Sequence, residues 1–214
     1  MKAYLFDLDG TVVNTLEDIT CAVNLMLVEY SFPIFTLEEI RQKIGNGARK
    51  LVQRALPENV AEDDEFVDKA LRTYQDFYTA HCTDKVSVYP GLEAVLRQMK
   101  NDGKKLAVVT NKDHMHATVI TDKLLPGVFD VVLGYNGRFP HKPNPESVLS
   151  IIKDFGVAPE EAAFVGDTWV DVETGRNAGM KTVGVEWGFS GLASYDENHQ
   201  PDVILTKSED LFLI

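Results

Sequence analysis

Short, unbroken apolar runs recur along the chain, and they limit its fold more than any other feature. Each run has three or four residues, which is long enough for a short strand and too short for a buried helix. Runs this rich in Val and Leu are typical of strands that are buried on both faces, as in a parallel sheet. The runs are residues 3–6, 106–109, 131–133, 162–165, 182–185 and 203–205.

Helical patterns lie between these runs. Apolar residues at positions 92, 95, 96 and 99 have the i, i+3, i+4, i+7 spacing of one helical face. Two further helices are expected over residues 146–155 and 170–178. Strands that alternate with helices predict an α/β fold: a Rossmann-like parallel sheet with helices on both faces.

One region interrupts this alternation. Residues 14–85 contain no strand candidate, and helical patterns cover residues 37–43, 48–55 and 63–81. An earlier helix is expected after Thr15, which has capping-box spacing to Asp18. The sequence therefore predicts a small all-helical cap domain, residues 14–85, inserted after the first strand of an α/β core formed by residues 1–13 and 86–214.

The overall charge limits the possible partners. Acidic residues outnumber basic ones by 33 to 21, a formal net charge of -12, whereas nucleic acids and anionic membranes need a basic face. Cys21 and Cys82 are too few for a disulfide framework and fit a reducing compartment. We expect no leader segment, and no apolar run of about 18 residues is present. We expect a cytoplasmic protein that binds neither nucleic acid nor membrane.

Polar residues follow three of the expected strands. Asp7-Leu8-Asp9-Gly10-Thr11 follows the first, Thr110-Asn111 the second, and Gly166-Asp167-Thr168 the fourth, with Asp171 four residues beyond Asp167. Lys142 lies in the proline-rich segment FPHKPNP. Ligands of open parallel sheets bind outside the carboxyl ends of the strands, so all these groups can reach one site.

Each motif has an ordinary explanation when taken alone. Asp-Gly after a strand is usually a turn, Thr-Asn and Asp167 suit helix caps, and Lys142 could be a solvated surface residue. A calcium loop is disfavoured because the D-x-[DN]-x-[DN]-G spacing is absent. The combination at one end of the sheet, in a fixed order, favours a functional site.

These four motifs together resemble those of the haloacid dehalogenase superfamily of phosphohydrolases. The helical insert is similar to the cap of the phosphoglycolate-phosphatase-like branch, and the resemblance spans essentially the whole chain. One departure is Asn14, where many members carry aspartate. We expect this difference to alter contacts of the cap hinge more than the chemistry.

The resemblance implies a covalent mechanism that depends on magnesium. Asp7 would be the nucleophile that forms an aspartyl-phosphate, Asp9 the general acid and then base, and Lys142 the fixed positive charge. Magnesium prefers hard oxygen ligands. These would be the carboxylates of Asp7 and Asp167 and the backbone carbonyl of Asp9, with Asp171 acting directly or through water.

The resemblance also implies how the phosphoryl group is held. The Thr110 hydroxyl, the Asn111 amide and backbone N–H groups after Asp7, those of Leu8 and Gly10, would contact its oxygens.

In an extended segment, residues i and i+2 share a face, so the carboxylates of Asp7 and Asp9 are expected to point the same way. Two carboxylates this close favour a protonated Asp9 before attack.

The segment IGNGARKLVQRAL in the expected cap interrupts the helical pattern. A plain turn between helices is one explanation. The other is a substrate-specificity loop, because the stretch resembles the corresponding loop of phosphoglycolate phosphatases and could bind a small carboxylate such as glycolate. The candidate residues are Gly45, Asn46, Gly47 and Arg49.

The favoured function is a magnesium-dependent phosphatase of a small phosphorylated metabolite, with 2-phosphoglycolate as the best single substrate. An inorganic pyrophosphatase, a nucleotidase and a sugar-phosphate mutase remain open. A carbon–halogen hydrolase is disfavoured, because those members lack a second aspartate at the position of Asp9. A catalytically silent binding protein would be expected to have lost Asp7, Asp9 or Lys142. The sequence leaves open whether the protein is a monomer or a homodimer.

Overall fold

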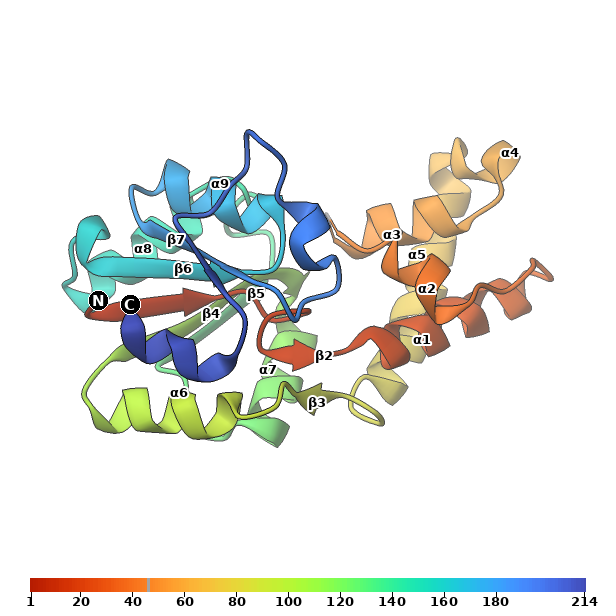
Figure 1. Ribbon diagram of the computed structural model, residues 1–214. Helices are drawn as coiled ribbons and strands as arrows, with labels where there is room; N and C mark the ends of the chain where they lie inside the picture. Colours follow the sequence, from red (N-terminus) through yellow and green to blue (C-terminus); the bar gives the residue numbers. More distant parts are fainter. Residues whose placement is uncertain (46) are drawn as a thin grey trace. The chain divides into compact units, whose positions relative to one another are not determined.

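A computed structural model describes residues 1–45 and 47–214. The chain divides into two compact units, which Figure 1 shows in ribbon form. Residues 1–14 and 87–214 form an α/β unit, called the core below, and residues 15–86 form a helical unit, called the insert. The boundaries expected from the sequence, after residues 13 and 85, differ from these by one residue.

The core contains a six-stranded sheet in the order β5-β4-β1-β6-β7-β8. Every neighbouring pair is parallel, so the predicted fold class is confirmed. Each strand includes the apolar run that predicted it. The strands are β1 Ala3–Phe6, β4 Lys105–Asp113, β5 Val131–Tyr135, β6 Ala162–Gly166, β7 Lys181–Val185 and β8 Val203–Leu205.

Helices cover both faces of this sheet (Figure 1). Helices α8 (Glu146–Phe155) and α9 (Trp169–Asn177) lie on one face, and α6 (Leu92–Asn101) and α7 (His114–Leu124) on the other. Leu5 of β1 is fully buried in the cluster that includes Val148 and Ile152 of α8. Side chains of a strand alternate between the faces, so the apolar runs are buried on both sides.

The order of the strands places β1 at the centre of the sheet. From β1 the chain continues to β4 and β5 on one side, and it later adds β6, β7 and β8 on the other. Ligands of open α/β sheets bind at the carboxyl ends of the strands where the strand order reverses. In this core that point is the end of β1, between the ends of β4 and β6.

A small antiparallel ribbon of the core was not predicted. Its strands are β2 (Val13–Asn14) and β3 (Ser87–Val88), with Val13 opposite Val88. The two strands flank the insert in the sequence, so the ribbon joins the point where the chain leaves the core to the point where it returns. Strands of two residues carry no periodic pattern, so they could not be predicted from the sequence.

The insert is all-helical in its described residues. Its helices are α1 Leu16–Glu29, α2 Leu37–Arg41, α3 Ala48–Ala55, α4 Glu58–Ala61 and α5 Asp64–His81. Ile19 and Val23 of α1 are buried, as are Ala70 and Tyr74 of α5, and these two helices pack together. Among the residues that the structure describes, no helix is both long and apolar enough to cross a membrane.

The capping box expected at the start of α1 is absent. The Asp18 carboxylate accepts hydrogen bonds from the backbone N–H groups of Lys85 (3.0 Å) and Val86 (3.0 Å) instead. Burial raises the pKa of Asp18. Asp18 therefore ties the first helix of the insert to its last residues, so the spacing that suggested a cap reflects a long-range contact.

Candidate active site

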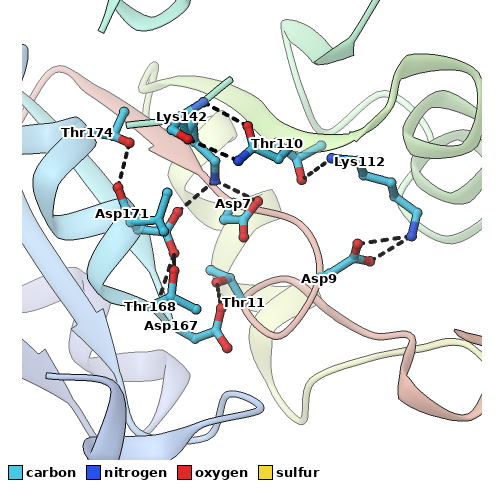
Figure 2. A network of polar contacts seen from close by, with 12 residues as sticks. Asp7, Asp9, Thr11, Thr110, Lys112, Lys142, Asp167, Thr168, Asp171 and Thr174 are labelled. Atoms are coloured by element: carbon cyan, nitrogen blue, oxygen red, sulfur yellow. Dashed lines mark hydrogen bonds and ion pairs between the residues drawn. The ribbon is translucent and has the colours of Figure 1, made fainter. Parts of the chain in front are cut away.

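The Asp7 carboxylate directly follows β1 and faces the ammonium group of Lys142 (Figure 2). Lys142 Nζ lies 2.9 Å from Asp7 Oδ1 and 2.6 Å from Asp171 Oδ1. The Lys142 side chain is only 4% exposed, and its Nζ lies 5.3 Å from the centroid of the Phe164 ring. The loop after β5 thus delivers a buried positive charge to the end of β1.

Asp171 links this lysine to helix α9. Thr168 is the N-cap residue of α9, and Asp171 lies three residues further on. Asp171 Oδ2 accepts hydrogen bonds from the Thr168 N–H (3.1 Å) and from its hydroxyl (2.8 Å). Because Oδ1 contacts Lys142, both oxygens of Asp171 have partners in the protein. Asp171 therefore holds Lys142 in place.

Asp167 follows β6 and is buried next to these groups. Its Oδ1 accepts a hydrogen bond from the Thr11 hydroxyl (3.3 Å), and its Oδ2 accepts one from the Phe189 N–H (2.9 Å). Gly10 has a φ of 81°, and a Cβ there would lie 2.4 Å from Asp167 Oδ2. A Cβ on Gly188 would lie 2.2 Å from the Asp167 Cβ. Only glycine lets these two segments approach Asp167 so closely.

The cluster holds three carboxyl groups and one ammonium group, so burial and like charges oppose the ionisation of Asp167. Burial raises the pKa of Asp167 well above its usual range, and the charges of Asp171 and Asp7 raise it further. Burial also raises the pKa of Asp171 despite the contact with Lys142. For Lys142, burial alone would lower the pKa, but Asp171 and Asp7 outweigh this effect and raise it. One ammonium group therefore faces three carboxylates.

These carboxylates fit a divalent cation. Asp7, Asp167 and Asp171 each offer one oxygen, and the three oxygens all lie within 4.8 Å of one another. Carboxylate oxygens are the ligands that Mg²⁺ prefers, and a second positive charge would balance the cluster. The three carboxylates and the lysine, all predicted from the sequence as site residues, thus lie close together. The part of the backbone carbonyl of Asp9 in metal binding stays a prediction.

The end of β4 contributes two polar residues in different ways. The Asn111 side chain accepts a hydrogen bond from the Lys142 N–H (2.8 Å) and donates one to the Lys142 carbonyl (3.2 Å). Asn111 therefore fixes the loop that carries Lys142. The buried Thr110 hydroxyl accepts the Lys112 N–H (3.3 Å) and can still donate its own hydrogen. Phosphate binding by either residue stays a prediction.

The segment after Asp7 corrects two expectations. The chain is not extended there, because the N–H groups of Thr11, Val12 and Val13 all donate to the Leu8 carbonyl. The carboxylates of Asp7 and Asp9 consequently point in different directions (Figure 2). The Gly10 N–H donates to the Val13 carbonyl (2.9 Å), so its predicted role in phosphate binding is not supported. The Leu8 N–H stays a prediction.

Asp9 has a partner that sequence reasoning missed. Lys112 Nζ lies 3.0 Å from both Asp9 Oδ1 and Asp9 Oδ2, and the two side chains are 7% and 18% exposed. Lys112 comes directly after Thr110-Asn111, at the strand end where ligands of such sheets bind. That position was the signal that could have found it.

The candidate specificity loop belongs to the insert. Gly47 is the N-cap residue of α3, and Gly45 and Gly47 have φ values of 115° and 84°. Arg49 forms ion pairs with Asp64 (2.6 Å) and Asp68 (3.0 Å) of α5. Asn46 lies outside the described residues. The described residues on either side of Asn46 lie between α2 and α3, and substrate binding by Gly45, Gly47 and Arg49 stays a prediction.

Comparisons with known proteins agree on one family. The model of the haloacid dehalogenase-like hydrolases matches residues 4–185. Phosphoglycolate phosphatase 1 of Pseudomonas aeruginosa is 35% identical over 98% of this chain and 78% of its own length. The phosphoglycolate phosphatase of Aquifex aeolicus is 34% identical over 99% of this chain and 95% of its own. The crystal structure of a predicted phosphoglycolate phosphatase from Haemophilus somnus matches with a TM-score of 0.90 and 28% identity, covering 100% of this chain and 97% of that one.

The chain belongs to the haloacid dehalogenase-like hydrolase family. The predicted family is therefore confirmed, and the four motifs that carried the resemblance lie within the matched residues. Several relatives within this family are named phosphoglycolate phosphatase.

Proposed function

We propose that the protein is a magnesium-dependent phosphatase of small phosphorylated metabolites and that 2-phosphoglycolate is its best substrate. The observation that carries this proposal is the buried cluster in which Asp7 and Asp171 share Lys142 while Asp167 lies close by. An anionic substrate could approach this acidic cluster only if positive charge compensates it, and Lys142 and a bound cation would supply that charge. The names of the relatives favour 2-phosphoglycolate.

In the first step, an Asp7 carboxylate oxygen attacks phosphorus. The Asp7 O–P bond forms as the bond from phosphorus to the leaving oxygen breaks, and Asp9 gives its proton to that oxygen. The Lys142 ammonium group, held by Asp171 and by the Asn111 clamp on its backbone, stabilises the charge that develops. The products are an alcohol and the aspartyl-phosphate.

In the second step, water attacks the phosphorus of the aspartyl-phosphate. A new O–P bond forms, the Asp7 O–P bond breaks and its electron pair returns to the carboxylate, and Asp9 takes the proton of the water. The Thr110 hydroxyl and the Leu8 N–H would hold the phosphoryl oxygens through both steps. The enzyme returns to its starting state after releasing inorganic phosphate.

The carboxylates of Asp7 and Asp167 would hold Mg²⁺ together with the Asp9 carbonyl, while Asp171 contributes through its hold on Lys142. When bound, the cation supplies positive charge that screens the repulsion between the Asp7 carboxylate and the phosphate dianion. Asp167 is buried, and its oxygens are held by the Thr11 hydroxyl and the Phe189 N–H, so its carboxylate is preorganised for that position.

A phosphate-release panel tests the proposal. It includes 2-phosphoglycolate, pyrophosphate, nucleoside monophosphates and hexose phosphates, each with and without Mg²⁺, and a separate isomerisation assay with a sugar phosphate tests the mutase alternative. We expect the highest kcat/KM with 2-phosphoglycolate. A chelator should abolish turnover, and excess Mg²⁺ should restore it. Phosphate release from no compound of the panel would overturn the proposal and favour a silent binding protein.

A further inference from the structure

The pair formed by Asp9 and Lys112 lies at the edge of the carboxylate cluster, apart from Lys142 (Figure 2). One ammonium group contacts both carboxylate oxygens of Asp9 at 3.0 Å. The side chains of Lys112 and Asp9 are 7% and 18% exposed, so water screens this pair less than it would screen a surface ion pair. The proposed phosphatase mechanism uses Asp9 but assigns nothing to Lys112.

The backbone of β4 explains how Lys112 reaches Asp9. The pairing of β4 with β5 is regular from Ala107 to Val109, and its register shifts between Val109 and Asp113. Such irregularities near the end of a strand redirect side chains. Within this stretch Asn111 binds the backbone of Lys142, and the next residue, Lys112, extends to Asp9. Asn111 and Lys112, neighbours in β4, thus contact Lys142 and Asp9 respectively.

The direction of Asp9 suits the role of an acid and base. In an in-line displacement, the leaving oxygen lies on the opposite side of phosphorus from the attacking Asp7 oxygen. The group that exchanges protons with the leaving oxygen, and later with water, therefore has no need to contact Asp7. Figure 2 shows the Asp9 carboxylate turned away from Asp7 and toward Lys112.

We propose that Lys112 is a positioning residue for Asp9. This inference rests on the proposed function. A contact to both oxygens restricts the rotation of the Asp9 carboxylate and holds it in one orientation. The proton transfers to the leaving oxygen and from water both depend on that orientation.

A substrate with a good leaving group separates the two steps. The departing p-nitrophenolate of p-nitrophenyl phosphate needs little protonation, so the first step with this compound depends weakly on Asp9. We therefore expect Lys112→Met to leave the first turnover within about threefold of wild type. The steady-state rate should fall by about 10–100-fold. This loss reaches only the lower end of the ~10²–10⁴-fold that general acid–base catalysis contributes, because Lys112 acts through Asp9. Rapid-mixing measurements of nitrophenolate would then show a burst of about one per active site.

Four further variants make the test specific. Lys112→Arg keeps the positive charge and can contact both Asp9 oxygens through its guanidinium group, so it should recover most of the steady-state rate. Asp9→Asn should show the same burst pattern as Lys112→Met. Lys153→Met removes an exposed lysine on α8 and should behave as wild type. Lys112→Gln repeats the measurement with an uncharged polar side chain if Lys112→Met fails to fold.

Two outcomes would overturn the assignment of Lys112. One is a steady-state rate within twofold of wild type in the folded uncharged variant. The other is an equal loss in the first turnover and in the steady state, because a general disturbance of the site slows both steps alike. Failure of the proposed function gives a different result: wild type itself would release no phosphate from any monoester, and the assignment would fall with it.

Discussion

The core and the insert place their charged side chains differently. In the core, the side chains of Lys142 and Asp171 are 4% and 2% exposed, and they contact each other at 2.6 Å. In the insert, Arg49 and Asp64 contact each other at the same distance, but their side chains are 40% and 83% exposed. Similar geometry therefore occurs in two very different dielectric surroundings.

The difference shows where the chain tolerates electrostatic cost. Removing charges from water costs several kcal/mol per ion even when they are paired, whereas an exposed pair costs little and contributes about 0–1 kcal/mol on average. The core bears that cost for three carboxylates around one lysine. A cost of this kind is expected where chemistry requires fixed, desolvated charges. Among the charged residues of the insert that the structure describes, only Asp18 is buried.

The largest effect is expected from removing the nucleophile. Asp7→Asn should lower phosphate release at least about 1,000-fold, because rate enhancements for phosphate monoesters reach ~10²¹ and the covalent step cannot be replaced by water alone. The measurement is release of phosphate from the best substrate of the panel at saturating Mg²⁺. The matched control, Asp154→Asn, changes an exposed aspartate of α8 and should retain full activity. A variant Asp7→Asn with a tenth of wild-type activity would show that the covalent scheme is wrong.

The second prediction compares the two regions directly by their stability. Lys142→Met leaves carboxylates buried without their cation, which should lower the free energy of unfolding by about 3–5 kcal/mol. The same change of a cation to methionine at exposed Arg49 should produce no measurable loss. Urea denaturation in the absence of Mg²⁺ measures both. Equal losses in the two variants would mean that burial does not distinguish these charge clusters.

The third prediction concerns the carboxyl groups of the core cluster. At about 100 times its Kd, a cation that binds only the folded state adds about 2.7 kcal/mol, and for a chain of this size this raises Tm by about 5–10 °C. Mg²⁺ should produce such a shift in wild type and only a small part of it in Asp167→Asn. Arg49→Met, in the insert, should show the full shift. An undiminished shift in Asp167→Asn would exclude this residue as a ligand.

Much of the core could be predicted from its sequence because its strands are buried on both faces. An apolar run such as residues 162–165 has few alternatives to a central strand, and β6 contains it entirely. The β2–β3 ribbon and helix α7 were missed for a physical reason. The ribbon strands have two residues each, and α7 has a mixed pattern with buried His116 and Thr121 and exposed Met115. Where apolar periodicity is weak, tertiary contacts determine the secondary structure of a segment.

For the site, the sequence predicted which residues lie together but not how they are hydrogen-bonded. Motif order placed Asp7, Lys142 and Asp167 together, because parallel strands deliver their carboxyl ends to one edge. The hydrogen-bond partners of these residues were harder to predict. The Gly10 N–H closes a turn, and Asn111 binds the backbone of a loop 31 residues away. Such pairings depend on local backbone geometry, which residue spacing does not encode.

The smallest effect is expected at the candidate specificity loop. The Arg49 guanidinium already contacts Asp64 and Asp68, so a substrate carboxylate would compete with these two for its donors. Arg49→Ala should therefore raise KM for 2-phosphoglycolate by no more than about tenfold, the value of ~1.4 kcal/mol in binding. KM for p-nitrophenyl phosphate, which lacks a carboxylate, should stay within twofold, and so should kcat for both. Asp68→Asn frees part of the guanidinium and should lower KM for 2-phosphoglycolate. Equal changes in KM for the two substrates would show that the turn between α2 and α3 joins two helices and does not select the substrate.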